Sequence, residues 1–75
     1  MDLHLTRIDE PRNMARYYAL EATGDLFGGA VMIRRWGRIG STGRDRREWF
    51  ADPTAAHHEA ERWRRAKVRR GYQEG

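Results

Sequence analysis

A chain of 75 residues forms one domain at most, here residues 1–75, and lies near the size at which a single hydrophobic core is only just sufficient. The absence of cysteine excludes disulfides and thiolate metal sites, and no apolar run approaches the ~20 residues needed to span a bilayer. The opening residues, MDLHLTRIDE, lack the basic-then-apolar pattern of a signal peptide, so we expect a soluble, cytoplasmic protein without a membrane partner.

The net charge of +4 is unevenly distributed along the chain. Residues 34–75 hold twelve of the fifteen basic residues but six of the eleven acidic ones, which leaves +6 there and −2 in residues 1–33. A basic half is typical of proteins that bind polyanions. Fourteen of the fifteen basic residues are arginine. An Arg- and Ala-rich composition also arises from GC-rich coding, so charge alone does not decide the partner.

The first two elements are predicted to be strands. Leu3 and Leu5 have the period-2 spacing of a strand that ends at the turn residues 9–11, Asp-Glu-Pro. Residues 13–23, NMARYYALEAT, alternate with Tyr18 on one face and Tyr17 on the other, which favours a second strand. The glycines of residues 24–29 then predict a hairpin loop.

The segment GAVMIRRWGRIG predicts a third strand with two unlike faces. Val31 and Ile33 share one face, which we expect to pack on the core, and Arg34 and Trp36 share the other, which we expect to meet a partner. Gly37 interrupts the alternation and predicts a bulge or tight bend.

After this strand, Ile39 is expected to return to the core, and residues 40–43, GSTG, predict a turn. Residues 44–50 predict a charged edge strand anchored in the core by Phe50, and Trp49 is a weaker candidate for a ligand platform than Trp36. Charges of this kind blunt an edge against pairing with another copy, so a monomer is favoured.

A long helix closes the chain. Asp52 is a preferred N-cap, Pro53 suits the first helical position, and Gly71 is the usual residue after a helix that runs to about residue 70. One apolar stripe faces the sheet, and Tyr72 is expected to fold back beside it. The residues of that stripe are Ala56, Ala60, Trp63 and the stem of Lys67. The predicted fold is α+β, an antiparallel sheet of four to five strands packed on one long C-terminal helix.

Catalytic and cofactor sites are poorly supported by this sequence. His57 and His58 are adjacent, so on a helix they point about 100° apart and do not readily share a metal. No acid–base pair is placed in a pocket that would shift its pKa values, so we expect no enzyme, no metal and no cofactor.

The spacing Gly37-x-x-Gly40-x-x-Gly43 is neither a dinucleotide fingerprint nor a phosphate-binding loop. Residues 37–40 do satisfy the G-x-x-G of KH domains, but that clamp joins two helices, whereas these residues follow a strand.

Residues 36–40, Trp-Gly-Arg-Ile-Gly, preceded by arginine and followed by a glycine-containing turn, resemble the WGR domain. That module occurs in DNA-dependent poly(ADP-ribose) polymerases and in small stand-alone bacterial proteins. The resemblance spans nearly the whole chain, from the Tyr-Tyr-x-Leu strand to the Ala-rich helix and the closing Lys67 and Gly71-Tyr72. It implies an antiparallel sheet with one helix, and a module that binds the end of a broken DNA duplex.

In the polymerases, the motif's tryptophan packs on the terminal sugar and its arginine contacts neighbouring domains. The resemblance therefore implies that Trp36 is the sugar platform. Residues 1–75 contain no zinc finger or catalytic domain to receive Arg38, so we expect its role here to be contact with phosphate, stabilisation of the hairpin or binding of a separate protein partner.

The sequence thus leads to two hypotheses. The first is a non-catalytic module that binds DNA ends or nicks by stacking and by phosphate contacts, with little sequence specificity. Its predicted DNA-binding residues are Trp36, Arg34, Arg35, Gly37, Arg38 and Arg44. The second is a protein-interaction module that uses the same Trp and Arg surface as an interface hot spot.

Overall fold

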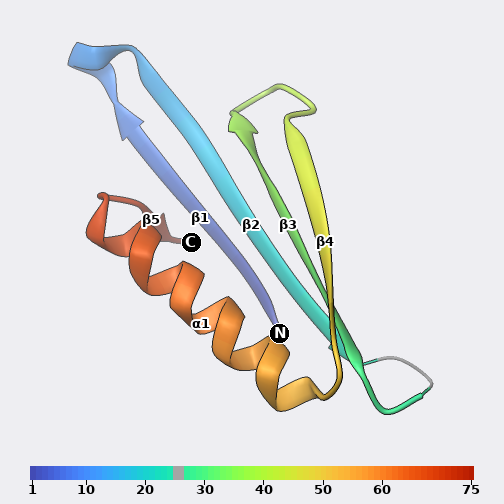
Figure 1. The fold of residues 1–75 in the computed structure, drawn as a ribbon. Helices are drawn as coiled ribbons and strands as arrows, with labels where there is room; N and C mark the ends of the chain where they lie inside the picture. Colours follow the sequence, from blue (N-terminus) through green and yellow to red (C-terminus); the bar gives the residue numbers. More distant parts are fainter. Residues whose placement is uncertain (25–26) are drawn as a thin grey trace.

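Five antiparallel strands form one sheet, and a long helix crosses one of its faces (Figure 1). The computed structural model describes residues 1–24 and 27–75. In chain order the elements are β1 (Asp2–Asp9), the 3₁₀ helix η1 (Glu10–Arg12), β2 (Met14–Gly24), β3 (Ala30–Arg38), β4 (Arg44–Phe50), α1 (Pro53–Arg69) and β5 (Gln73–Glu74). The sheet has the order β4-β3-β2-β1-β5, so β4 lies at an edge. The predicted α+β fold is confirmed.

The predicted turns fall where the chain reverses. Asp9 precedes η1, which contains Glu10 and Pro11, and Asn13 follows it with a positive φ of 51° before β2 begins. In the loop between β2 and β3, Gly28 has a φ of +85°. The rest of the predicted glycine hairpin includes residue 25, which lies outside the described residues.

Both ends of α1 form as the sequence predicts. The Asp52 carboxylate accepts a hydrogen bond of 2.9 Å from the Ala55 amide, with Pro53 at the first helical position. Gly71 has a φ of +95° after the last turn, and the Tyr72 amide donates to the Lys67 carbonyl at 3.1 Å. This turn directs the chain back toward the sheet, where β5 pairs with β1.

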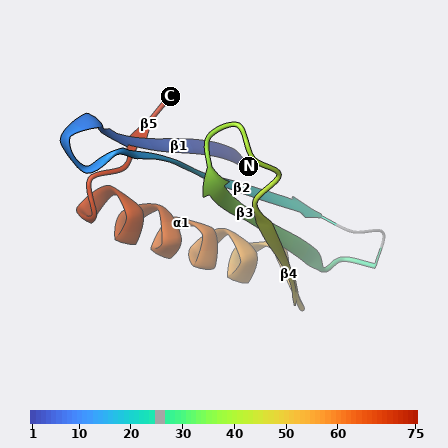
Figure 2. The same ribbon diagram turned by 90° about the horizontal axis from the view of Figure 1, so that it is seen from above.

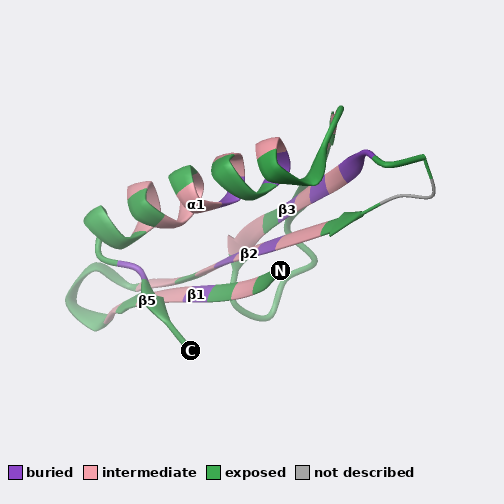
Figure 3. Cartoon of the chain, turned by 90° about the horizontal axis from the view of Figure 1, so that it is seen from below, coloured by how far each residue is buried: buried purple, intermediate pink, exposed green. Residues whose placement is uncertain are grey.

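The core lies between α1 and the face of the sheet that carries Leu5, Tyr18 and Met32, which we call the helix face. Its fully buried members, together with Tyr72 at the rim, are Leu5, Tyr18, Leu20, Met32, Ala60 and Tyr72. Figure 3 shows the buried segments of the strands and of α1 turned toward each other. Trp63 and Phe50 pack against this cluster, as predicted, and so does Trp36.

The predicted assignment of faces in β3 is wrong. Met32 is fully buried, and Arg34 is 7% exposed, whereas Val31 and Ile33 are only partly covered on the opposite side, the open face. The cause is the register with β2, which places Trp36 opposite Tyr18 and Arg34 opposite Leu20. Cross-strand partners lie on the same face of the sheet. Because side chains alternate along a strand, the face of one residue fixes the faces of all the others.

Gly37 produces no bulge, and Ile39 does not return to the core. β3 continues through Gly37 to Arg38, and Ile39 is 45% exposed. A Cβ on Gly37 would lie 2.8 Å from the Gly43 Cα, so glycine is needed because the β3–β4 turn folds closely over it. The turn lies on the open face, opposite α1 (Figure 2). There the Ile39 amide donates to the Ala15 carbonyl at 2.9 Å and the Tyr17 hydroxyl donates to the Thr42 carbonyl at 3.1 Å.

Substitution of the turn glycines separates backbone strain from steric overlap. Gly40 and Gly43 both have positive φ, but a Cβ on Gly40 meets open space, whereas one on Gly43 collides with the Trp36 carbonyl and the Tyr17 hydroxyl. We expect Gly40→Ala to lower the free energy of unfolding by about 1 kcal/mol and Gly43→Ala by about 2–4 kcal/mol. Urea unfolding followed by circular dichroism measures both, and equal losses would contradict the close packing of this turn.

Candidate nucleic-acid interface

Trp36 lies on the helix face and is only partly exposed. Its ring stacks on Tyr18 with centroids 6.4 Å apart and an angle of 25° between planes. The sequence predicted an exposed platform on the side away from the core, and that placement is wrong. Trp36 is both a member of the core and part of the wall of a surface pocket.

This pocket, of about 250 Å³, combines three cations with the aromatic rings of Trp36 and Tyr72. We call it the Trp36 pocket, and it is lined by Arg16, Tyr17, Trp36, Gly37, Arg38, Lys67 and Tyr72. None of these residues is acidic. A pocket with aromatic walls and uncompensated positive charge favours a ligand that has a flat or sugar-like body and a negative group.

Lys67 brings the helix into this pocket. Its ammonium nitrogen lies 4.7 Å from the centroid of the Tyr18 ring and 5.4 Å from that of Tyr72. Burial lowers the pKa of Lys67, and the nearby charges of Arg70, Arg34 and Arg16 lower it further. Arg16 lines the pocket with Lys67, and Arg34 and Arg70 are close enough to act on its charge, so a bound anion would relieve the repulsion between these cations.

Arg38 connects the two hairpins of the sheet. Its guanidinium donates to the Asn13 carbonyl at 3.1 Å and to the Asn13 side-chain oxygen at 3.4 Å, which fastens the turn between β1 and β2 to the end of β3. This contact with the β1–β2 turn is not one of the three roles that the sequence left open, and those roles stay predictions. Two of the five N–H donors of the guanidinium are used in these bonds, and the others remain for a ligand.

Arg44 is the neighbour of Trp36 across the β3–β4 ladder and is exposed. It is therefore placed to extend the positive surface beyond the pocket on the helix face.

Arg34 and Arg35, which the sequence grouped with Trp36, do not join this surface. Arg34 is buried, lies 4.1 Å from the centroid of the Trp63 ring and forms an ion pair of 3.0 Å with Glu48. Arg35 lies on the open face, paired with Glu21 at 3.6 Å. Successive residues of a strand point to opposite faces, so the two arginines could not both flank Trp36.

Four residues that line the pocket were not among the predicted binding residues: Arg16, Tyr17, Lys67 and Tyr72. Arg16 has the same parity in β2 as Tyr18, and Lys67 lies on the same helical stripe as Trp63. Both signals were in the sequence. They become informative only when the register between β2 and β3 is known, because that register places Trp36 beside Tyr18.

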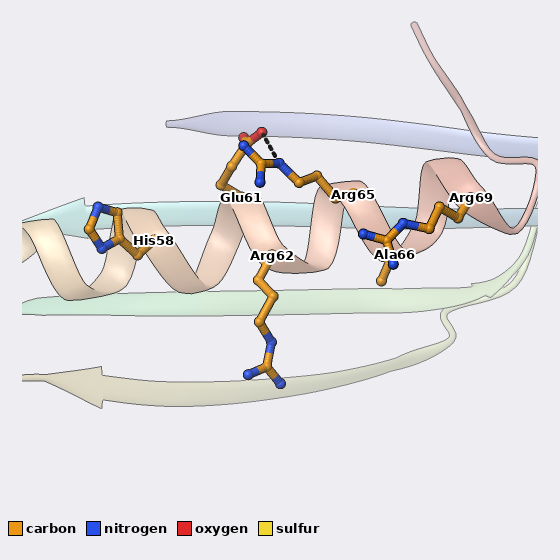
Figure 4. Close-up of a pocket in the computed structure, with 6 residues that line it drawn as sticks. All are labelled: His58, Glu61, Arg62, Arg65, Ala66 and Arg69. Atoms are coloured by element: carbon orange, nitrogen blue, oxygen red, sulfur yellow. Dashed lines mark ion pairs between the residues drawn. The ribbon is translucent and has the colours of Figure 1, made fainter.

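A larger hollow of about 440 Å³ lies on the outer side of α1 among arginine side chains (Figure 4). Its lining includes Glu61, which pairs with Arg65 at 3.4 Å, while Arg62 pairs with Glu59 at 3.8 Å. It contains no Trp, Tyr or Phe. Two of its three arginines are paired with carboxylates, so the Trp36 pocket is the better candidate despite its smaller volume.

The described residues contain no cluster of three or more histidine or carboxylate side chains that could hold a metal ion. Within the same residues, no helix combines the length and the apolar character needed to cross a membrane.

A small α+β fold that carries a basic pocket with aromatic walls on its helix face is typical of a binding module. A family model of the WGR domain matches residues 1–75, and the chain belongs to that family. WGR domains are non-catalytic, nucleic-acid-binding modules.

Among curated proteins, the chain is similar to the "Uncharacterized protein y4dW" of Sinorhizobium fredii (strain NBRC 101917 / NGR234). The two are 51% identical over 41 residues, which cover 55% of this chain and 20% of the relative. The match thus spans about a fifth of that longer protein. No solved structure matches the chain.

The two adjacent arginines of β3 provide a direct test of the assignment of faces. We expect Arg34→Ala to lower the free energy of unfolding by about 2–4 kcal/mol, because it removes the ring contact with Trp63 and leaves Glu48 without its closest partner. Arg35→Ala, the matched control on the open face, should change it by less than about 0.5 kcal/mol. Urea unfolding measures the free energy for both variants. A larger loss for Arg35→Ala than for Arg34→Ala would contradict the assignment of Arg34 to the helix face.

Proposed function

We propose that this chain binds the ends or nicks of DNA through the Trp36 pocket. The observation that carries the proposal is the meeting of Trp36 with Arg16, Arg38 and Lys67 in one pocket without a carboxylate. Family membership supports nucleic acid as the ligand class, and the pocket supports a site at which a terminal nucleotide fits.

Ends and nicks suit this pocket because of what they expose. In a continuous duplex the base faces are stacked and neighbouring nucleotides cover much of each sugar, so a recessed indole has little to contact. At a terminus one face of the sugar and base is free. Trp36 is held by its stacking on Tyr18, so it presents a fixed surface to that free face.

The phosphates beside the terminus are bound by the surrounding cations. Arg16, Arg38 and Lys67 line the pocket and Arg44 extends the same face. Contacts to phosphate carry little sequence information, so we expect weak sequence preference. Four such contacts give a slope of roughly −3.6 for the logarithm of affinity against the logarithm of salt concentration.

The first test compares two tryptophans. Trp36→Ala should weaken binding to a short blunt duplex by about 5- to 100-fold, since stacking on an aromatic side chain contributes on the order of 1–3 kcal/mol. Trp49→Ala is the matched control, because Trp49 lies on the open face, and it should leave the affinity unchanged. Fluorescence anisotropy at nanomolar protein concentration measures both, after circular dichroism has established that each variant is folded.

Competition among blunt, nicked, circular and single-stranded DNA then tests the preference for termini. Linear and nicked DNA should compete better than circular DNA of the same sequence. Equal competition by circular DNA, or an unchanged affinity of Trp36→Ala, would refute recognition of ends.

The second test uses the titration of Lys67. Because its pKa is lowered, Lys67 loses its proton before an ordinary lysine does, so DNA affinity should fall as the pH rises from neutrality toward 10.5. Lys67→Arg keeps its charge throughout and should reduce this fall. Lys67→Gln should make the salt slope less steep by about 0.9. Identical pH profiles for the wild type and Lys67→Arg would exclude Lys67 from the binding site.

A further inference from the structure

Among the described residues, no helix lies over the open face of the sheet, and only the β3–β4 turn folds onto it. Helix α1 covers only the helix face, and the two sides are distinct in Figure 2. Large apolar side chains are exposed on the open side: Trp49 is 72% exposed, Ile8 66% and Ile39 45%. Val31, the cross-strand partner of Trp49, is partly exposed beside it. Ile8 and Ile39 lie beside Ala15 at one end of this face, and Trp49 and Val31 lie toward its other end. Exposed apolar residues on one face mark an interaction surface.

Part of this face is concave. A hollow of about 300 Å³ is lined by His4, Thr6, Tyr17, Ile39 and Gly40. The ring of His4 lies parallel to that of Tyr17, with centroids 6.3 Å apart, and the β3–β4 turn forms one wall. None of these residues is an acid, a lysine or an arginine, so the hollow suits an apolar or aromatic side chain.

The charges of the open face are balanced, unlike those of the helix face. Arg35 pairs with Glu21 at 3.6 Å, and the alternation of β4 places Asp45 and Arg47 on the same side. The helix face carries Arg16, Arg38, Arg44 and Lys67. Two copies with a net charge of +4 repel each other in most orientations. On the open face, acidic residues of each copy can lie opposite basic residues of the other.

We propose that the open face binds the open face of a second copy of this chain. In a two-fold contact the same surface of both copies must be complementary to itself. On the open face, Trp49 of one copy can enter the apolar hollow of the other, and a carboxylate of one can pair with a guanidinium of the other. The molecule measures 47, 24 and 16 Å along its principal axes. Its broad face is therefore on the order of 1,000 Å², enough for the ~800 Å² that each partner of a standard interface buries.

This arrangement is distinct from pairing of the edge strand β4, whose charges favoured a monomer in the sequence. It also leaves the Trp36 pocket on the outer side of each copy, so it does not depend on DNA binding. Its failure and that of the proposed function are therefore separable.

Sedimentation equilibrium of the whole chain tests the proposal. The wild type should reach twice its mass of 8.8 kDa as its concentration rises. Trp49→Glu and, as a second variant, Ile39→Glu should weaken association by at least about ten-fold. Val68→Glu is the matched control, because Val68 is 43% exposed but lies on α1, and it should associate as the wild type does.

Three results would overturn the proposal: a wild type that remains monomeric at millimolar concentration, association that survives both open-face substitutions, or equal weakening by Val68→Glu. A wild type that is monomeric alone but binds a different protein through Trp49 would assign the face to that protein instead. DNA affinity of Trp49→Glu at nanomolar concentration should equal that of the wild type, which reports separately on the Trp36 pocket.

Discussion

The arrangement of this protein depends on one buried cation. The guanidinium of Arg34 lies over the ring of Trp63 and reaches Glu48 on the neighbouring strand, so it joins β3 to both α1 and β4. Trp36, whose ring centroid lies 5.7 Å from the same guanidinium, stacks on Tyr18. Desolvation of a charge is tolerated only with close partners, so Arg34 requires these residues in these places. In a chain with few large aliphatic residues, this contact sets which face of β3 meets the helix.

The face of β3 determines the charge of each surface. With even-numbered residues of β3 turned toward α1, the arginines at positions 16, 38 and 44 gather on the helix face with Lys67. The odd-numbered residues of β3 face the open side, where Arg35 pairs with Glu21 of β2. A modest net charge is thereby divided into a strongly basic surface and a nearly neutral one. Composition predicts the total charge but not this division, which follows from strand pairing.

Three side chains of the Trp36 pocket are held in place by contacts with neighbouring residues. Trp36 is held by Tyr18, Arg38 is tied to Asn13, and Lys67 lies over two tyrosine rings. A ligand therefore meets side chains that are already ordered, and little conformational entropy is lost on binding. The same construction couples binding to stability. A substitution at Trp36 removes part of the core along with the pocket wall.

Local signals in the sequence were sufficient for β1 to β4 and for α1 with both its ends, but not for η1 or β5. The capping of α1 by Asp52, its end at Gly71 and the alternation of β2 around Tyr18 depend only on neighbouring residues, and so does the WGR motif. Trp36, Arg38 and Arg44 were also identified and lie on one face. The face itself was not predictable, because Val31 and Ile33 are as apolar as the buried Met32 and a strand's alternation fits either orientation. Which face of β3 packs on α1 decides that Arg34 is buried and that Arg35 lies on the open face. It also decides that Arg16 and Lys67 line the pocket. Only the tertiary structure decided it, through the register of β3 against β2 and the ring of Trp63 that receives the Arg34 guanidinium.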